Sequence, residues 1–163
     1  MTPHESDRVR VRRAVIMEGA AARSSDALGS AVNDMFGPSV NDVALGMTAT
    51  PLNLRLARLV GSGLASQAGM SVEEIEDVRI GIDEACSALL AAGARRDLEL
   101  RFHLEDGVLA VDIRAELPNP PPLRLPDDVR EILDAVTARW WSAQEASTAV
   151  VGLLGRRDAR VAP

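Results

Sequence analysis

Residues 71–92, SVEEIEDVRIGIDEACSALLAA, carry the strongest helix signal in the chain. Ser71 with Glu74 three residues later predicts a capping box, in which each side chain accepts a hydrogen bond from the backbone N–H of the other residue. Gly93 is the expected end of the helix. Apolar side chains recur at three- and four-residue steps and predict one buried stripe of Ile75, Val78, Ile82, Ala85, Cys86 and Leu89. We expect the rest of the fold to pack around this helix.

Composition narrows the class of protein. The 163 residues suit one domain with a real hydrophobic core, and the net charge is −6. With two Phe, two Trp and no Tyr, the chain has few rings on which bases could stack. Its charge would also repel a phosphate backbone. Direct binding to nucleic acid is therefore not expected.

The sequence predicts neither a disulfide nor a membrane segment. Cys86 is the single cysteine and lies in the apolar stripe, which indicates a small buried residue in a reducing compartment. No apolar run approaches the ~20 residues that span a bilayer. Glu18 interrupts the short apolar stretch that follows the N-terminal arginines, so a signal peptide is not indicated. We expect a cytoplasmic protein without membrane contacts.

The two ends of the chain are predicted to lie outside the domain. Residues 1–41 lack sustained periodicity and are rich in Ala, Ser, Gly and Asp, which predicts a mobile tail. The run RVRVRR within this segment could instead dock on an acidic partner. A single domain is expected over residues 42–157, followed by a short tail over 158–163.

A strand and a helix are predicted ahead of the capped helix. Val43, Leu45 and Met47 alternate with smaller residues, as in a half-buried strand. Thr50 and Pro51 then form a helix entry, with the threonine as cap and the proline in the first turn. The helix is expected to run to Gln67, to bury some combination of Leu52, Leu56, Leu59, Val60 and Leu64, and to expose Arg55 and Arg58.

A hairpin follows the capped helix. Residues 98–104 and 109–115 alternate between apolar and polar side chains, and Asp106–Gly107 between them is a strong turn signal. His103 lies on the polar phase and is interpreted as a solvated strand histidine, because no second ligand has metal-binding spacing with it. The proline-rich residues 117–126 are expected to form a loop.

The last part of the domain is predicted to be a helix and a strand. Pro126 opens a helix that extends roughly to Trp140, and residues 148–154 form the final strand. Adjacent Trp140 and Trp141 would then lie on different helix faces, one towards the core and one at the rim, where an exposed Trp is a natural interface anchor. This order predicts an α+β two-layer sandwich, with helices on one face of a mostly antiparallel sheet.

The order of elements and the segment EDVRIGIDEACSALL resemble the GHKL (Bergerat-fold) ATPases. The similarity is closest to the anti-sigma factors of the bacterial switch-protein serine kinase group, and it covers about residues 41–157. In that family a glutamate of the helix polarises the hydroxyl that is phosphorylated, and the resemblance places this role on Glu84. Asp83 is the alternative, by a one-residue rotation. An arginine of the preceding helix contacts the sigma factor and its antagonist, and LARL maps it to Arg58.

The nucleotide motifs of the family are replaced in this sequence. The family's magnesium-binding asparagine falls on Ala88, whose methyl group cannot coordinate a hard cation. The aspartate and two glycines that hold adenine fall on Ala115, Leu117 and Asn119, although a shifted alignment would offer Glu116 as the acid. Proline lacks an amide donor, so PNPPP is a poor phosphate cradle. Neither ATP nor magnesium is expected to bind.

The sequence therefore predicts a regulatory protein that sequesters a sigma factor without ATP. By the resemblance it forms a homodimer and is released by a competing anti-anti-sigma protein. Arg58, Arg55 and Trp141 are the predicted partner-binding residues. Two alternatives remain open at this point: an active ATP-dependent serine kinase that phosphorylates the antagonist with Glu84 as catalytic residue, and a non-catalytic module of another signalling assembly. Glu84 could also be solvated or paired with Arg79 or an arginine of the preceding helix.

Overall fold

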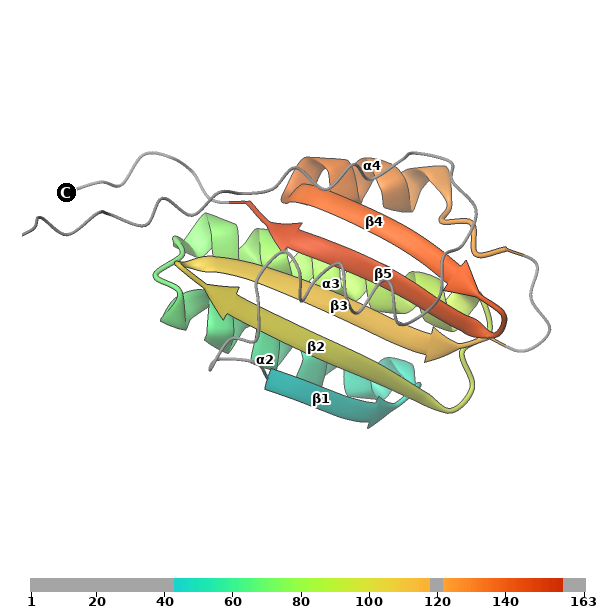
Figure 1. Ribbon diagram of the computed structural model, residues 1–163. Coiled ribbons are helices and arrows are strands. Elements are labelled where there is room, and N and C mark those ends of the chain that lie inside the picture. The colour runs from blue at the N-terminus through green and yellow to red at the C-terminus, as the bar shows by residue number, and fades with distance from the viewer. Residues whose placement is uncertain (1–42, 118–121, 157–163) are drawn as a thin grey trace, which may run out of the picture.

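The computed structural model describes residues 43–117 and 122–156 (Figure 1). The two predicted tails and Asn119 lie outside these ranges, as does the arginine run of the N-terminal segment. Within them the chain forms five strands, three α-helices and one 3-10 turn. Their order is β1 (Val43–Thr48), η1 (Pro51–Asn53), α2 (Leu54–Gln67), α3 (Val72–Ala91), β2 (Asp97–Glu105), β3 (Val108–Glu116), α4 (Asp127–Val136), β4 (Thr137–Glu145) and β5 (Thr148–Gly155).

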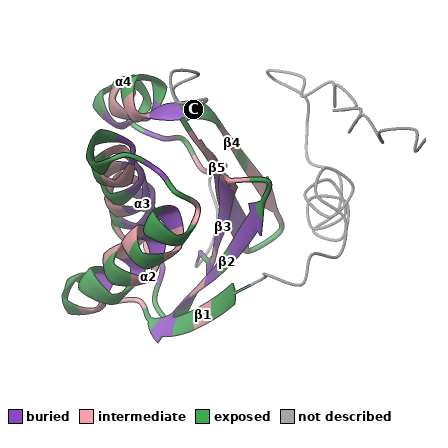
Figure 2. Ribbon diagram, turned by 90° about the vertical axis from the view of Figure 1, so that its left-hand side faces the viewer, coloured by how far each residue is buried: buried purple, intermediate pink, exposed green. Residues whose placement is uncertain are grey.

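The strands form one open sheet in the order β1-β2-β3-β5-β4, and every neighbouring pair is antiparallel. All three helices pack on the same face of this sheet, with α3 between α2 and α4 (Figure 2). The predicted α+β class with helices on one face of an antiparallel sheet is therefore confirmed. The core lies between the two layers, and its fully buried large side chains include Ile82, Leu89, Leu98, Leu100, Phe102, Ile113 and Val151.

Helix α3 forms as its sequence predicts. Ser71 Oγ accepts from the Glu74 N–H at 3.2 Å, and the Ser71 N–H donates to Glu74 Oε2 at 2.6 Å, which completes the capping box. Beyond the helix, Gly93 adopts a φ of 98° that suits glycine, and its N–H donates to the Leu90 carbonyl. The predicted apolar stripe is buried against the sheet, although Ile75 at its N-terminal end is only half-buried.

The hairpin is also confirmed. Strands β2 and β3 pair over their whole length, with Leu104 opposite Leu109 next to the turn. Asp106 and Gly107 both have positive φ, 49° and 75°, which is the backbone conformation of a tight two-residue hairpin turn. The turn fixes the register, so that one set of alternating residues faces the helices and the other set faces away.

The prediction that a helix extends to Trp140 is wrong. Helix α4 ends at Val136, and the next nine residues form β4, an edge strand that pairs with β5. Thr137 makes the change of direction, because its backbone is extended and its hydroxyl donates to the Leu133 carbonyl at 2.7 Å. Threonine and tryptophan favour strands, and a free edge of β5 was available to pair with them.

The predicted buried face of α2 is confirmed only in part. The side that packs inward carries Leu54 and the small residues Ala57, Gly61 and Ala65. A Cβ on Gly61 would lie 2.3 Å from Ile82 Cδ1, so the absence of a side chain there allows α2 to approach α3 closely. Val60 and Leu64 are half-buried beside this face, and the remaining leucines point away from the core.

Candidate partner-binding surface

An apolar stripe lies on the solvent side of α2 and the turn before it. Leu52, Leu56 and Leu59 are 71%, 40% and 69% exposed. They are spaced by four and three residues, which places them along one side of the helical segment. Figure 2 shows that α2 forms the outer edge of the helical layer, on the side away from α4. We call these three residues the leucine stripe. Nothing in the described part of the chain covers it.

The two arginines of α2 have different surroundings. Arg55 is exposed and shares the side of the helix that carries the leucine stripe, because it follows Leu52 by three residues and precedes Leu59 by four. Arg58 is turned towards α3, where its guanidinium Nη1 donates to Asp83 Oδ1. About a third of each of these two side chains remains exposed, 33% for Arg58 and 38% for Asp83. Arg58 thus lies on the side of α2 that faces α3, and it already has an internal carboxylate partner.

Glu84 follows Asp83 in the sequence and is half-buried, but it is not part of the ion pair between Arg58 and Asp83. Among the described residues, Arg58 of α2 binds Asp83, and Arg79 donates a hydrogen bond to Glu76 Oε2 at 2.5 Å. The two pairings considered for Glu84 from sequence are therefore taken by other carboxylates. Asp83, offered as the alternative to Glu84, is the residue that the fold brings to Arg58.

The positions that correspond to nucleotide ligands lie in the hydrophobic core. Ala88 on α3, Ala115 on β3 and Leu117 after it are all buried among apolar side chains. Glu116 is exposed and lies on the sheet face opposite to these residues. Within the described ranges, no group of three His, Cys, Asp or Glu side chains could hold a metal ion.

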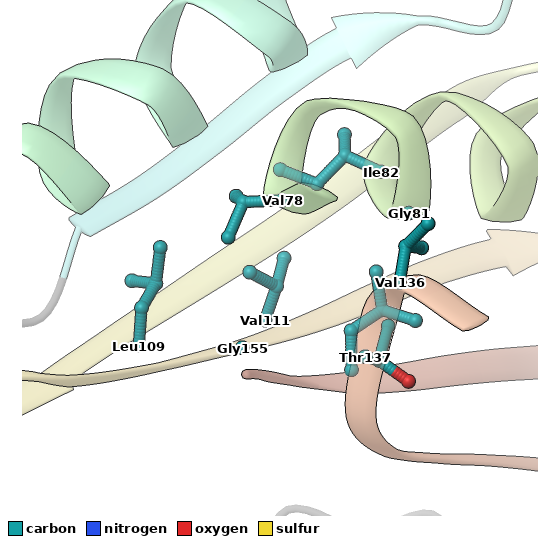
Figure 3. Close-up of a pocket in the computed structure, with 9 residues that line it drawn as sticks. Val78, Gly81, Ile82, Leu109, Val111, Val136, Thr137 and Gly155 are labelled. Carbon is teal, nitrogen blue, oxygen red and sulfur yellow. The ribbon is translucent and has the colours of Figure 1, made fainter. Parts of the chain in front are cut away.

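A cavity between α3, α4 and the sheet is too small for a ligand. Its volume is about 10 Å³, close to the minimum for one water molecule. Figure 3 shows that it is lined by apolar groups and by Thr137, whose hydroxyl is already bonded to the end of α4. Its lining residues are Val78, Gly81, Ile82, Leu109, Val111, Val136, Thr137, Leu153 and Gly155. The space between these elements is thus closed by packing.

The structure separates Trp141 from the two arginines. Trp140 faces the helical layer, packs against the core and donates from Nε1 to Asp134 Oδ1 at 2.7 Å. Trp141 points to the opposite face of β4, where its indole lies over Gly152 of β5. The prediction that the two rings face opposite ways is right, but the element is a strand and not a helix. Trp141 cannot share one continuous patch with the leucine stripe.

The sequence interpretation missed a buried acid–base pair on the sheet face that carries Trp141. His103 Nε2 lies 4.0 Å from Asp112 Oδ2, and both side chains are almost fully buried. The expectation of a solvated His103 is therefore wrong. A signal was present in β5, TAVVGLLG, because a continuous apolar run indicates a strand that is buried on both faces.

Burial controls the chemistry of the two most perturbed groups. Loss of solvation raises the pKa of Asp112 to about 6, against the opposing attraction of His103, Arg114 and Arg101. Loss of solvation also raises the pKa of the Cys86 thiol to about 12, and the nearby Asp83 carboxylate acts in the same direction. Cys86 is therefore a packing residue, as predicted, and not a nucleophile.

In comparisons with known proteins, the chain matches no protein-family model and no curated protein. Among the described helices, none combines the length and the apolar character needed to cross a membrane.

Proposed function

We propose that this chain is a regulatory protein that sequesters a sigma factor through helix α2, on a reduced Bergerat-like fold. The observation that carries the proposal is the leucine stripe, with Arg55 on the same side and Arg58 partly exposed between α2 and α3. Exposed apolar residues that line up with a cationic side chain have the composition of a protein-binding anchor region. The order of strands and helices over residues 43–156 adds support, since it follows the order of that family apart from the reduced nucleotide elements.

The proposed activity is binding and not phosphoryl transfer. Ala88, Ala115 and Leu117 place apolar groups where the resemblance would require oxygen ligands and close backbone approach, and they are part of the packed core. A nucleotide in this position would have to displace that core. Sequestration needs only the surface of α2, so we propose that release depends on an anti-anti-sigma competitor with overlapping contacts. By the same resemblance we propose a homodimer.

The test is calorimetric titration of the full chain with the sigma factors of its own genome, followed by ATP with magnesium. We expect tight binding to one sigma factor and no heat with nucleotide. The double substitution Leu56→Asp with Leu59→Asp is expected to weaken that binding by about 30-fold or more, the effect of losing an anchor worth about 2 kcal/mol. Val72→Asp is the control, since Val72 at the start of α3 is an apolar residue that is even more exposed, at 83%.

Three results would overturn the proposal. Micromolar binding of ATP with magnesium would favour the serine kinase and would make Glu84 the next residue to substitute. Absence of binding to every sigma factor would favour a module of another signalling assembly. Equal loss of binding in the α2 double variant and in the Val72 variant would remove the leucine stripe from the interface.

A further inference from the structure

The sheet has a second buried surface, on the face opposite to the helices. The side chains on this face belong to the alternate residues of β2, β3, β5 and β4, and the register places Arg101, Asp112, Gly152 and Trp141 in one row across the four strands. His103, Ala110 and Leu154 form the adjacent row. We call this set, with Arg114 and Val150, the outer face.

The centre of the outer face is closed to solvent. Ala110, Val150, Asp112 and His103 are only 1%, 2%, 3% and 5% exposed. Yet α2, α3 and α4 all lie on the other face, as the edge-on view shows (Figure 2). Neighbouring side chains account for part of this burial, since the Trp141 indole covers Gly152. A sheet face open to water would leave central residues such as His103 largely accessible, so this face has a cover that α2, α3 and α4 do not provide.

The polar groups on this face also indicate a cover. The acid–base pair of His103 and Asp112 is removed from water in the middle of the sheet. Arg114 Nε is buried and has no hydrogen-bond partner among the described residues. A buried donor without a partner costs free energy, so such groups usually meet an acceptor from a segment packed on them. The outer face thus combines a buried acid–base pair, apolar neighbours and one buried donor without a hydrogen-bond partner among the described residues.

We propose that residues 1–42 of the same chain pack across the outer face. Strand β1 begins at Val43, at the edge of the sheet next to β2. Strands are spaced by about 4.8 Å, so β5 is about 14 Å from β1, and roughly five extended residues cross that distance. A segment of 42 residues has ample length. Its run AVIM, residues 14–17, supplies apolar side chains for Ala110, Val150 and Trp141.

Charge supports the same occupant. The exposed charged residues of the outer face are the carboxylates of Asp97, Glu105 and Glu116 and the guanidinium groups of Arg101 and Arg139. The run RVRVRR, residues 8–13, directly precedes AVIM and carries four arginines. The carboxylates at the ends of β2 and β3 can pair with arginines of this run while the apolar run covers Ala110 and Val150. The other two segments outside the described ranges fit less well. Residues 157–163 are short and carry three charged residues in seven, which suits an apolar surface poorly. Residues 118–121 are only four residues between two described parts of the chain and are too short to cross the face.

Photo-crosslinking in the full chain tests the proposal. p-Benzoylphenylalanine replaces Ala143, a half-buried residue of β4 opposite Val150 on the outer face. We expect crosslinks to residues 1–42 within one chain, which mixing with 15N-labelled chains distinguishes from crosslinks between chains. The matched control places the same group at Ala135, an exposed residue of α4 in the helical layer, and is expected to give no such crosslinks. Crosslinks to 157–163, to a second copy, or to nothing would overturn the proposal.

Thiol reactivity gives a second, independent measurement. In the full chain, Val150→Cys is expected to react with maleimide at least tenfold more slowly than Ser87→Cys, an exposed site on α3. Adding Val15→Asp and Ile16→Asp is expected to raise the rate at residue 150 at least tenfold. Val151→Cys, on the core face of the same strand, should stay unreactive in both chains. An unchanged rate at residue 150 would contradict docking through AVIM.

Discussion

Arg58 on α2 and Asp83 on α3 form an ion pair that joins the two helices. The residue that the sequence predicts to bind a partner carboxylate is therefore bound to an internal one. Because each side chain is about one-third exposed, the pair is expected to contribute at most about 1 kcal/mol to the free energy of unfolding. Under the proposed function its main consequence concerns binding, since a carboxylate of the proposed partner would have to compete with Asp83 for Arg58.

This competition gives the first prediction. Asp83→Asn removes the internal competitor and is expected to tighten binding of the sigma factor several-fold, whereas Arg58→Ala is expected to weaken it by tenfold or more. Both affinities can be measured by the same calorimetric titration. Arg79→Ala is the matched control, because Arg79 is exposed and pairs with Glu76 within α3. Weaker binding in the Asp83 variant would mean that the pair orients Arg58 for the partner.

The second prediction concerns the close approach of α2 and α3. Gly61→Ala adds a Cβ that would lie 2.3 Å from the buried Ile82 Cδ1, so it is expected to lower the free energy of unfolding by about 1–3 kcal/mol. Gly63→Ala lies two residues later on the exposed side, with no atom within 4 Å of the added carbon. It is expected to raise the free energy of unfolding by up to about 1 kcal/mol, since alanine favours helix over glycine. Urea unfolding measures both, and equal effects would contradict this packing.

These two glycines show why the sequence predicts α2 but not its orientation. The helix offers two stripes, one of leucines and one of Ala57, Gly61 and Ala65, and hydrophobicity alone favours the leucines. The small residues face inward because α3 lies close enough that only they fit, and that distance is a property of the packed layers. The proposed binding surface is therefore not predicted when the most apolar stripe is expected to be buried.

Elements with strictly local causes are the ones that the sequence predicts well. The capping box of α3 and the Asp106–Gly107 turn depend on residues next to each other, and both form as expected. Strand β4 depends on pairing with β5, which is contributed by residues further along the chain, so the end of α4 could not be placed from its own residues. The buried pair of His103 and Asp112 likewise depends on what covers the outer face.

The third prediction tests the burial of Cys86. Because desolvation raises the pKa of its thiol to about 12, the thiolate is scarce at pH 8 and no reagent can reach it in the folded chain. Ellman's reagent is expected to modify Cys86 only as fast as the chain unfolds, and in full within minutes in 6 M guanidinium chloride. Ser87→Cys is the comparison, since it places an exposed thiol one residue further along α3. Rapid reaction of Cys86 in the native chain would show that α3 is not packed as described.

The fourth prediction follows from the raised pKa of Asp112, about 6 in the folded chain against an ordinary value of 3.8. The folded state holds this proton more tightly than the unfolded state, so the free energy of unfolding falls as pH rises from about 4 to 6. The size of the shift corresponds to about 3 kcal/mol at most. Asp112→Asn removes the buried charge but also its attraction to His103, Arg101 and Arg114.

Urea unfolding at pH 4.5 and pH 7.5 measures the outcome. The Asp112→Asn variant is expected to be about 1–3 kcal/mol more stable than the original chain at pH 7.5, with the difference shrinking at pH 4.5 because Asp112 is then largely protonated in the folded original chain. Asp97→Asn, at an exposed carboxylate of the same face, should leave the pH dependence unchanged. Lower stability of the Asp112 variant at pH 7.5 would mean that the ion pair with His103 outweighs the loss of solvation, and that the outer face is wetter than its burial indicates.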